Sequence, residues 1–213
     1  MFIQGRLTAF CLALFLQFLF IGEKLVQSES FSVYTVLFVF LLLGCAYFGG
    51  REYDKVLNEA NTDMLTKVYN RRFILNTFPS LTKQCERIFV IIVDCDDFKK
   101  INDSYGHEMG DQVLITVAKA LKKHVGELQY VARWGGDEFV ILGKLNNDDQ
   151  MERYIESIQE ELRQSVKKLS IPLSVSIGYA IYPTDADTLC SLMKIADENM
   201  YGLKANNKKV SVS

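Results

Sequence analysis

Two long runs without a charged residue occupy most of the first fifty positions of this 213-residue chain, at 7–22 and 31–50. A helix needs about 17 to 25 apolar residues to cross the hydrocarbon core of a bilayer. The second run meets this length. The first meets this length if its helix extends toward the N-terminus past Arg6, whose long side chain can reach the membrane–water interface. We therefore predict a two-helix transmembrane hairpin over residues 1–50, with helices at about 4–22 and 31–50.

The first apolar run could also belong to a secretory signal peptide, which starts with charged residues and ends at a small-residue cleavage site. The start of this chain carries little charge and no such cleavage site follows, so a spanning helix is favoured. Arg6, Arg51 and Lys55 flank the outer ends of the hairpin, whereas its short connection contains Lys24. Because positive charges favour the cytoplasmic side, we expect both ends of the hairpin in the cytoplasm.

The chain after position 50 has the composition of a water-soluble domain. The whole chain has a net charge of −2, which provides no basic footprint for nucleic acid, so no nucleic-acid partner is expected. The five cysteines are too scattered for a disulfide framework or a zinc site, and we expect them as reduced thiols.

Residues 51–62 are predicted to be a helical linker between the hairpin and the following domain. Tyr53, Val56, Leu57 and Ala60 recur at helical spacing and form one apolar stripe. The stripe fits either a short coiled coil between two copies of the chain or a face packed on its own domain. We favour the contact between two copies.

Residues 63–213 predict one α+β domain. The predicted strands are 87–94, 129–133, 138–142 and 173–180, and the first is central because it is apolar on both faces. The predicted helices are 69–79, ending near Pro79, then 111–121, 146–169 and 188–204, with a glycine-containing loop at 104–111. The order strand, helix, strand, strand, helix, strand is the βαββαβ plan of ferredoxin-like and nucleotidyl-cyclase palm domains. This plan is an antiparallel sheet with helices on one face.

Two glycines and two carboxylates, Gly135, Gly136, Asp137 and Glu138, stand between two of these strands. The glycines predict a tight hairpin turn of a primed type, which requires positive φ angles. Bare backbone there lets a large anionic ligand approach, beside carboxylates that can hold its Mg²⁺. A hairpin followed by a solvated acidic pair is the alternative. Asp94 ends the neighbouring central strand, so Asp94 and Asp137 are expected to converge on one ion.

Six sequence blocks, taken in order over residues 62–208, resemble the GGDEF family of diguanylate cyclases. The blocks lie at 63–66 with 69–73, 94–103, 105–111, 135–139, 176–178 and 196–204. The resemblance implies a bacterial enzyme that condenses two GTP into cyclic di-GMP and releases two pyrophosphates. Its site would require Mg²⁺, or alternatively Mn²⁺, and would be shared by the two subunits of a homodimer.

The resemblance also implies roles for individual residues. Mg²⁺ would be held by Asp94, the carbonyl of Cys95 and Asp137, with Glu138 assisting. Asp137 is also the family's usual candidate for accepting the proton of the 3′-hydroxyl. The implied substrate-binding residues are Asn102 and Asp111 for the guanine edge, His107 in the same loop, the backbone at Phe98 and Lys99, Gly135, Gly136, and Lys204 as a charge for the phosphates.

Combined with the hairpin, the resemblance predicts a multi-pass protein of the bacterial inner (cytoplasmic) membrane with its catalytic domain, residues 63–213, in the cytoplasm. The alternative is a catalytically silent, membrane-anchored module that binds GTP or dimerises. Many family members carry an R-x-x-D product-inhibition site before the glycines. Gly126 and Gln129 occupy its charged positions here, so we expect no feedback inhibition through that site.

Overall fold

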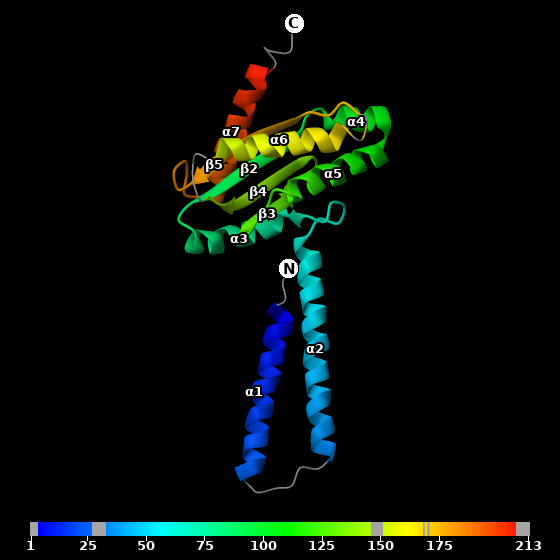
Figure 1. Cartoon of the computed structure of the whole chain (residues 1–213), viewed down its shortest axis with the longest axis vertical. Helices are drawn as coiled ribbons and strands as arrows, with labels where there is room; N and C mark the ends of the chain where they lie inside the picture. Colours follow the sequence, from blue (N-terminus) through cyan, green and yellow to red (C-terminus); the bar gives the residue numbers. More distant parts are fainter. Residues whose placement is uncertain (1–3, 27–32, 146–150, 168, 170, 208–213) are drawn as a thin grey trace. The chain divides into compact units, whose positions relative to one another are not determined.

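The computed structural model describes residues 4–26, 33–145, 151–167, 169 and 171–207, with side chains described except at 24–26 and 201–207. The chain divides into two compact units, residues 1–60 and residues 61–213. The first contains the two apolar runs, and the second contains the sheet (Figure 1).

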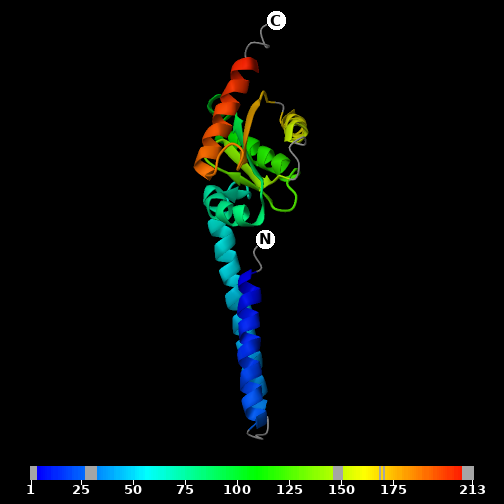
Figure 2. The ribbon, with the colours of Figure 1, turned by 90° about the vertical axis from the view of Figure 1, so that its left-hand side faces the viewer.

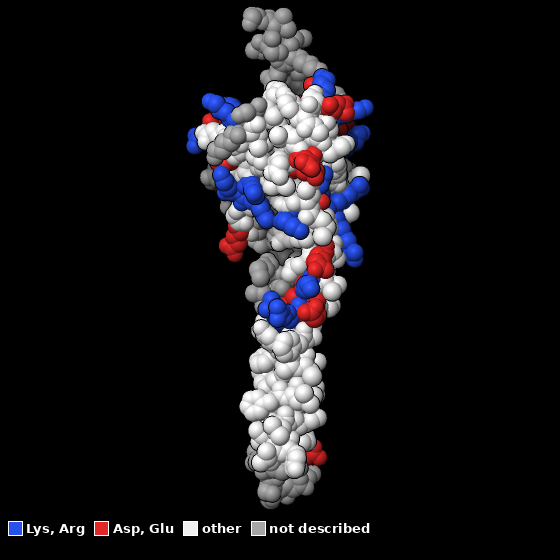
Figure 3. Space-filling view, turned by 90° about the vertical axis from the view of Figure 1, so that its right-hand side faces the viewer, with Lys and Arg blue, Asp and Glu red and all other residues white. Residues whose placement is uncertain are grey.

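Helices α1 (Gln4–Val26) and α2 (Val33–Asn61) form the first unit. Both contain stretches long and apolar enough to cross a membrane, and little of either stretch is buried. Most of their length is uncharged in the space-filling view (Figure 3). Helix α2 continues without a break through the predicted linker, where Tyr53 and Val56 are exposed. Along the pair, the side-chain amide of Gln17 donates to the carbonyl of Val39 over 2.8 Å.

Asp54, a residue of the predicted helical linker 51–62, joins the N-terminus of α1 to α2. Asp54 is 1% exposed. Its carboxylate accepts from the backbone N–H of Gly5 at 2.8 Å and of Arg6 at 3.2 Å, and from the Arg6 Nε at 3.1 Å. A Cβ on Gly50 would stand 2.7 Å from the Arg6 Cα. A carboxylate at a helix N-terminus satisfies otherwise unpaired N–H groups, so this contact fixes how the helices meet.

The second unit has a five-stranded sheet in the order β1-β3-β4-β2-β5. All neighbouring strands are antiparallel except β1 and β3. The strands are β1 (Tyr69–Asn70), β2 (Ile88–Cys95), β3 (Gln129–Arg133), β4 (Glu138–Lys144) and β5 (Val175–Tyr182). The helices are α3 (Arg71–Gln84), α4 (Phe98–Tyr105), α5 (His107–Lys122), α6 (Met151–Lys167) and α7 (Leu189–Asn207). The predicted α+β fold is confirmed, and β2 is an inner strand that pairs with β4 on one side and β5 on the other.

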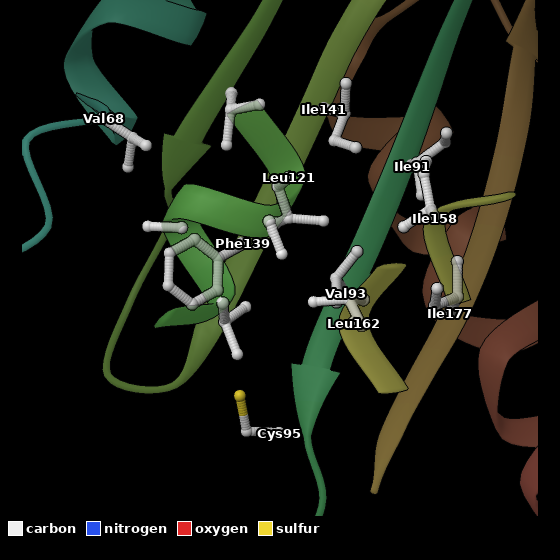
Figure 4. Close-up of a cluster of buried hydrophobic side chains, with 14 of the residues drawn as sticks. Val68, Ile91, Val93, Cys95, Leu121, Phe139, Ile141, Ile158, Leu162 and Ile177 are labelled. Carbon is white, nitrogen blue, oxygen red and sulfur yellow. The ribbon is translucent and has the colours of Figure 1, made fainter. Parts of the chain in front are cut away.

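Helices cover both faces of the sheet (Figure 2). On one face, Ile91 and Val93 of β2 join a buried cluster with Leu121 of α5 and with Ile158 and Leu162 of α6 (Figure 4). Full burial of each such side chain contributes about 1.5 to 3 kcal/mol. Helices α5 and α6, which belong to the βαββαβ plan, therefore lie on the same face of the sheet, as predicted.

The opposite face is covered by α3 and α7, which lie outside the βαββαβ plan, so the prediction of helices on one face only is wrong. Gly178 of β5 lies against the backbone of Ala196 and Met200 in α7. Phe78 of α3 packs edge-on against Tyr182 of β5, with ring centroids 5.9 Å apart. The second apolar face of β2 requires this second helical layer.

Two local predictions are also corrected. Helix α3 continues through Pro79 to Gln84, because burial of Phe78 and Leu81 on either side outweighs the one hydrogen bond that proline cannot donate. The predicted loop at 104–111 is a sharp bend at Gly106, whose φ of +84° separates α4 from α5. Helix α6 ends at Lys167, and its predicted start at 146–150 lies outside the described residues.

Candidate functional site

The acidic hairpin joins β3 to β4 at the end of the sheet. The backbone N–H of Trp134 donates to the carbonyl of Glu138 at 2.8 Å and closes the turn. The expectation of a primed turn is wrong, because positive φ among the described glycines occurs at Gly106 and not in this loop. The loop between the strands has four residues, 134–137, and longer loops do not require positive φ at both glycines. Gly135 and Gly136 are exposed and leave bare backbone at the tip.

Strand register brings the predicted acids to one end of β2 and β4. Asp94 lies directly opposite Glu138, and residues in such a pair point to the same face of the sheet. The backbone N–H of Cys95 donates to the carbonyl of Asp137 at 3.3 Å. The structure therefore places Asp94 beside Glu138, and Asp137 beside Cys95.

The carboxylates at this end of the sheet repel one another, as the pKa of Glu138 shows. Burial raises the pKa of Glu138, and the carboxylates of Asp94, Asp137 and Asp197 raise it further, while the guanidinium of Arg71 lowers it. Asp197 belongs to α7 and was not singled out in the sequence, although it lies within the last of the six sequence blocks, 196–204.

A hard cation that takes oxygen ligands would relieve this repulsion, so the donor set suits Mg²⁺. In the described part of the chain, no three His, Cys, Asp or Glu side chains already converge as a metal cluster. Burial and the carboxylates of Asp137, Asp94 and Asp96 raise the pKa of the Cys95 thiol to about 12. The thiol therefore stays protonated near neutral pH, and its carbonyl is the group suited to a metal.

The residues implied for guanine recognition lie where α4 meets α5. Asn102 of α4 is half-buried, and its side-chain oxygen lies against Gly110 in the first turns of α5. Asp111 follows Gly110 directly, and both it and His107 are exposed. Helix packing therefore brings Asn102 against Gly110, the residue before Asp111, although Asn102 and Asp111 are nine positions apart in the chain.

The groups implied for phosphate binding come from two helices. Phe98 and Lys99 begin α4, and the N–H groups of a first helical turn have no partners within the helix. Asp97, which precedes them, has a left-handed φ of 55° and turns the chain into the helix. Lys204 lies in α7, but its side chain is outside the described residues.

Sequence reasoning missed Arg133, which supports the hairpin. Its Nε and Nη2 donate to the carbonyl of Gly136 at 3.0 and 2.7 Å, and its Nη1 lies 3.4 Å from Asp63. Burial raises the pKa of Asp63, but hydrogen bonds from Thr66 and the charge of Arg133 outweigh it and lower the pKa overall. Arg133 thus ties the tip of the hairpin to the first turn of the domain.

If Asn102 contacts GTP as the family resemblance implies, replacing Gly110 by alanine should weaken nucleotide binding more than folding. The new methyl group would occupy the position of the Asn102 side-chain oxygen, and that flexible amide can move aside. We expect the KM for GTP to rise about tenfold, the effect of losing one good hydrogen bond, with less than about threefold loss of kcat.

Steady-state kinetics of the Gly110→Ala chain checks this, and Gly126→Ala is the matched control because its methyl group would meet only the Gln129 side chain, at 3.9 Å. An unchanged KM in Gly110→Ala would show that Asn102 does not contact the substrate.

A largely antiparallel sheet with acids at the end of the inner strand β2 and on the adjacent hairpin defines an α+β domain of the nucleotidyl-cyclase palm class. A sequence model described as "Diguanylate cyclase, GGDEF domain" matches residues 60–210. The chain belongs to this family, and the predicted family is confirmed.

Several proteins named as diguanylate cyclases or probable diguanylate cyclases are similar to this chain. Diguanylate cyclase DosC of Escherichia coli K12 is 35% identical over 159 residues, covering 71% of this chain and 34% of DosC. The probable diguanylate cyclase DgcT of the same organism is 32% identical over 216 residues, covering 94% of this chain and 46% of DgcT. The chain thus spans a third to a half of the length of these relatives.

Solved structures agree with the fold. The coiled coil and GGDEF domain of DgcB from Caulobacter crescentus, in complex with c-di-GMP, is 27% identical. It superposes with a TM-score of 0.63, covering 73% of this chain and 86% of that chain.

Proposed function

We propose that this protein is a membrane-anchored diguanylate cyclase that condenses two GTP into cyclic di-GMP and two pyrophosphates. The observation that carries the proposal is the strand register that sets Asp94 opposite Glu138 and Asp137 beside Cys95. Membership of the GGDEF family supports the same reaction.

Asp94, Asp137, Glu138 and the carbonyl of Cys95 would hold Mg²⁺, or Mn²⁺ in its place. The bound metal would polarise phosphate oxygens and lower the pKa of a coordinated hydroxyl. Asp137 is the last residue of the hairpin loop, from which its carboxylate would accept the proton of the attacking 3′-hydroxyl.

Substrate recognition would come from the other residues of the site. The Asp111 carboxylate suits the N1–H and N2–H₂ donors of guanine, and the Asn102 amide can both donate and accept there. His107 lies at the start of the same helix. The backbone N–H groups of Phe98 and Lys99 and the bare backbone at the hairpin would receive the phosphates.

Each domain would hold one GTP, so forming two phosphodiester bonds requires two domains facing each other. The exposed stripe at Tyr53 and Val56 on α2 suits a contact between the helices of a homodimer.

Helices α1 and α2 would anchor this dimer in the inner membrane of a bacterium, in contact with its lipid bilayer. The chain would cross the membrane twice, with both termini in the cytoplasm. GTP is supplied on that side, and the positive residues at the outer ends of the hairpin agree with it.

The full chain, purified in detergent micelles and incubated with GTP and Mg²⁺, tests the reaction. We expect cyclic di-GMP and pyrophosphate in a ratio of one to two, separated by chromatography, and no product when EDTA removes the metal. GTP binding without product at high protein concentration would contradict the proposal and favour a silent GTP-binding module.

Cyclic di-GMP should not inhibit the enzyme through residues 126–129, the position of the R-x-x-D site that precedes the hairpin in many family members. The side chain of Gln129 is engaged locally, accepting from the backbone N–H of Gly126 at 2.9 Å, and neither residue carries a charge for the product. We expect the initial rate to change by less than about twofold as product is added at saturating GTP. Potent non-competitive inhibition in that titration would show that another site replaces the missing one.

A further inference from the structure

Arg71 stands over the ring of Trp134, with its guanidinium carbon 4.7 Å from the ring centroid. Arg71 begins α3 and is exposed, whereas Trp134 is half-buried and directly precedes the glycines of the catalytic hairpin. Cation–π attraction engages the charge of an arginine but leaves its N–H donors for another partner. The stack therefore holds the N–H donors of the Arg71 guanidinium, which form a planar fork, at the edge of the hairpin.

This fork lies on the same side of the sheet as two of the carboxylates. Asp94 is opposite both Glu138 in β4 and Ser176 in β5. Ser176 and Gly178 are two residues apart and share a face, and the Gly178 face is covered by α7. Asp94 and Glu138 thus point to the face that carries α3 and α7, which is where Arg71 lies.

We propose that Arg71 binds the polyphosphate of the nucleotide and that Trp134 holds it in position. A polyphosphate can approach the carboxylates only if cations offset their mutual repulsion. An arginine fork matches two phosphate oxygens at once, and its stack on Trp134 reduces the rotamer entropy lost on binding. This inference rests on the proposed function, because it names a further contact of the same substrate.

The other arginines nearby do not fill this role. Arg133 is committed to the carbonyl of Gly136 and to Asp63, so it holds the loop. Arg72 is also exposed but stands one helix position, about 100°, away from Arg71. It therefore provides a matched control of the same charge.

Trp134 is the single tryptophan of the chain, so its fluorescence reports on ligands at the hairpin. The full chain in detergent micelles, which add no tryptophan, is titrated with pyrophosphate in Mg²⁺ and separately with guanosine. In Arg71→Gln we expect the Kd for pyrophosphate to rise about tenfold, while the Kd for guanosine and the thermal midpoint stay unchanged. Arg71→Lys should recover part of the loss, and Arg72→Gln should match the natural chain within about twofold.

The KM for GTP should rise in parallel in Arg71→Gln, with kcat changed less. Pyrophosphate binding in Arg71→Gln equal to that of the natural chain would overturn the inference. Equal weakening of pyrophosphate and guanosine would also overturn it, since a merely structural role predicts that result. A natural chain that binds pyrophosphate and makes no cyclic di-GMP would contradict the proposed function alone.

Discussion

Asp137→Asn should reduce the proposed synthesis of cyclic di-GMP more than any other single change at the site. Asp137 lies at the hairpin exit, its carbonyl accepts from the backbone N–H of Cys95, and its charge raises the pKa of the neighbouring Glu138. The amide keeps the shape of the side chain but removes both the charge and the proton acceptor. We expect kcat to fall about 100-fold or more, the usual loss for a positioned general base or metal ligand.

The initial rate of product formation by the full chain measures this loss, with the thermal midpoint as a check on folding. Asp187→Asn is a suitable control, because Asp187 is an exposed carboxylate in the turn before α7. Turnover in Asp137→Asn equal to that of the control would show that the acid cluster has no role in the mechanism.

The largest loss of stability is expected from Gly178→Ala, in the middle of β5. The added Cβ would overlap the carbonyl of Ala196 and stand 2.6 Å from the Met200 backbone nitrogen. These atoms belong to the backbone of α7, which cannot move aside as the end of a flexible side chain can. We expect a loss of about 3 kcal/mol, at the upper end for overpacking, and a fall in Tm of about 6 to 12 °C.

Circular dichroism of the second unit's unfolding transition, recorded on the full chain, checks this prediction. Gly126→Ala adds the same methyl group where only the Gln129 side chain lies within reach, at 3.9 Å, so its Tm should change little. A Tm for Gly178→Ala equal to that control would mean that α7 packs less closely on β5 than described.

The sequence by itself determined the two apolar helices, the inner strand β2, the acidic hairpin and the α+β class. Each of these depends on a local pattern: a charge-free length, a run of β-branched residues, or two glycines between strands. The same patterns located Asp94, Asp137 and Glu138, because chemistry-bearing residues stood at the ends of recognisable strands. Six ordered blocks then sufficed to identify the family.

Tertiary structure alone decided which residues support that site. Arg71 meets Trp134 and Arg133 meets Asp63 across more than sixty positions. In the helical hairpin, away from the site, Asp54 likewise meets Gly5 across 49 positions. Such contacts join single residues that follow no helical or strand periodicity, so no local sequence pattern predicts them. The helical layer of α3 and α7 was missed for a related reason. A strand buried on both faces requires cover on each, but only the folded chain shows which helices provide it.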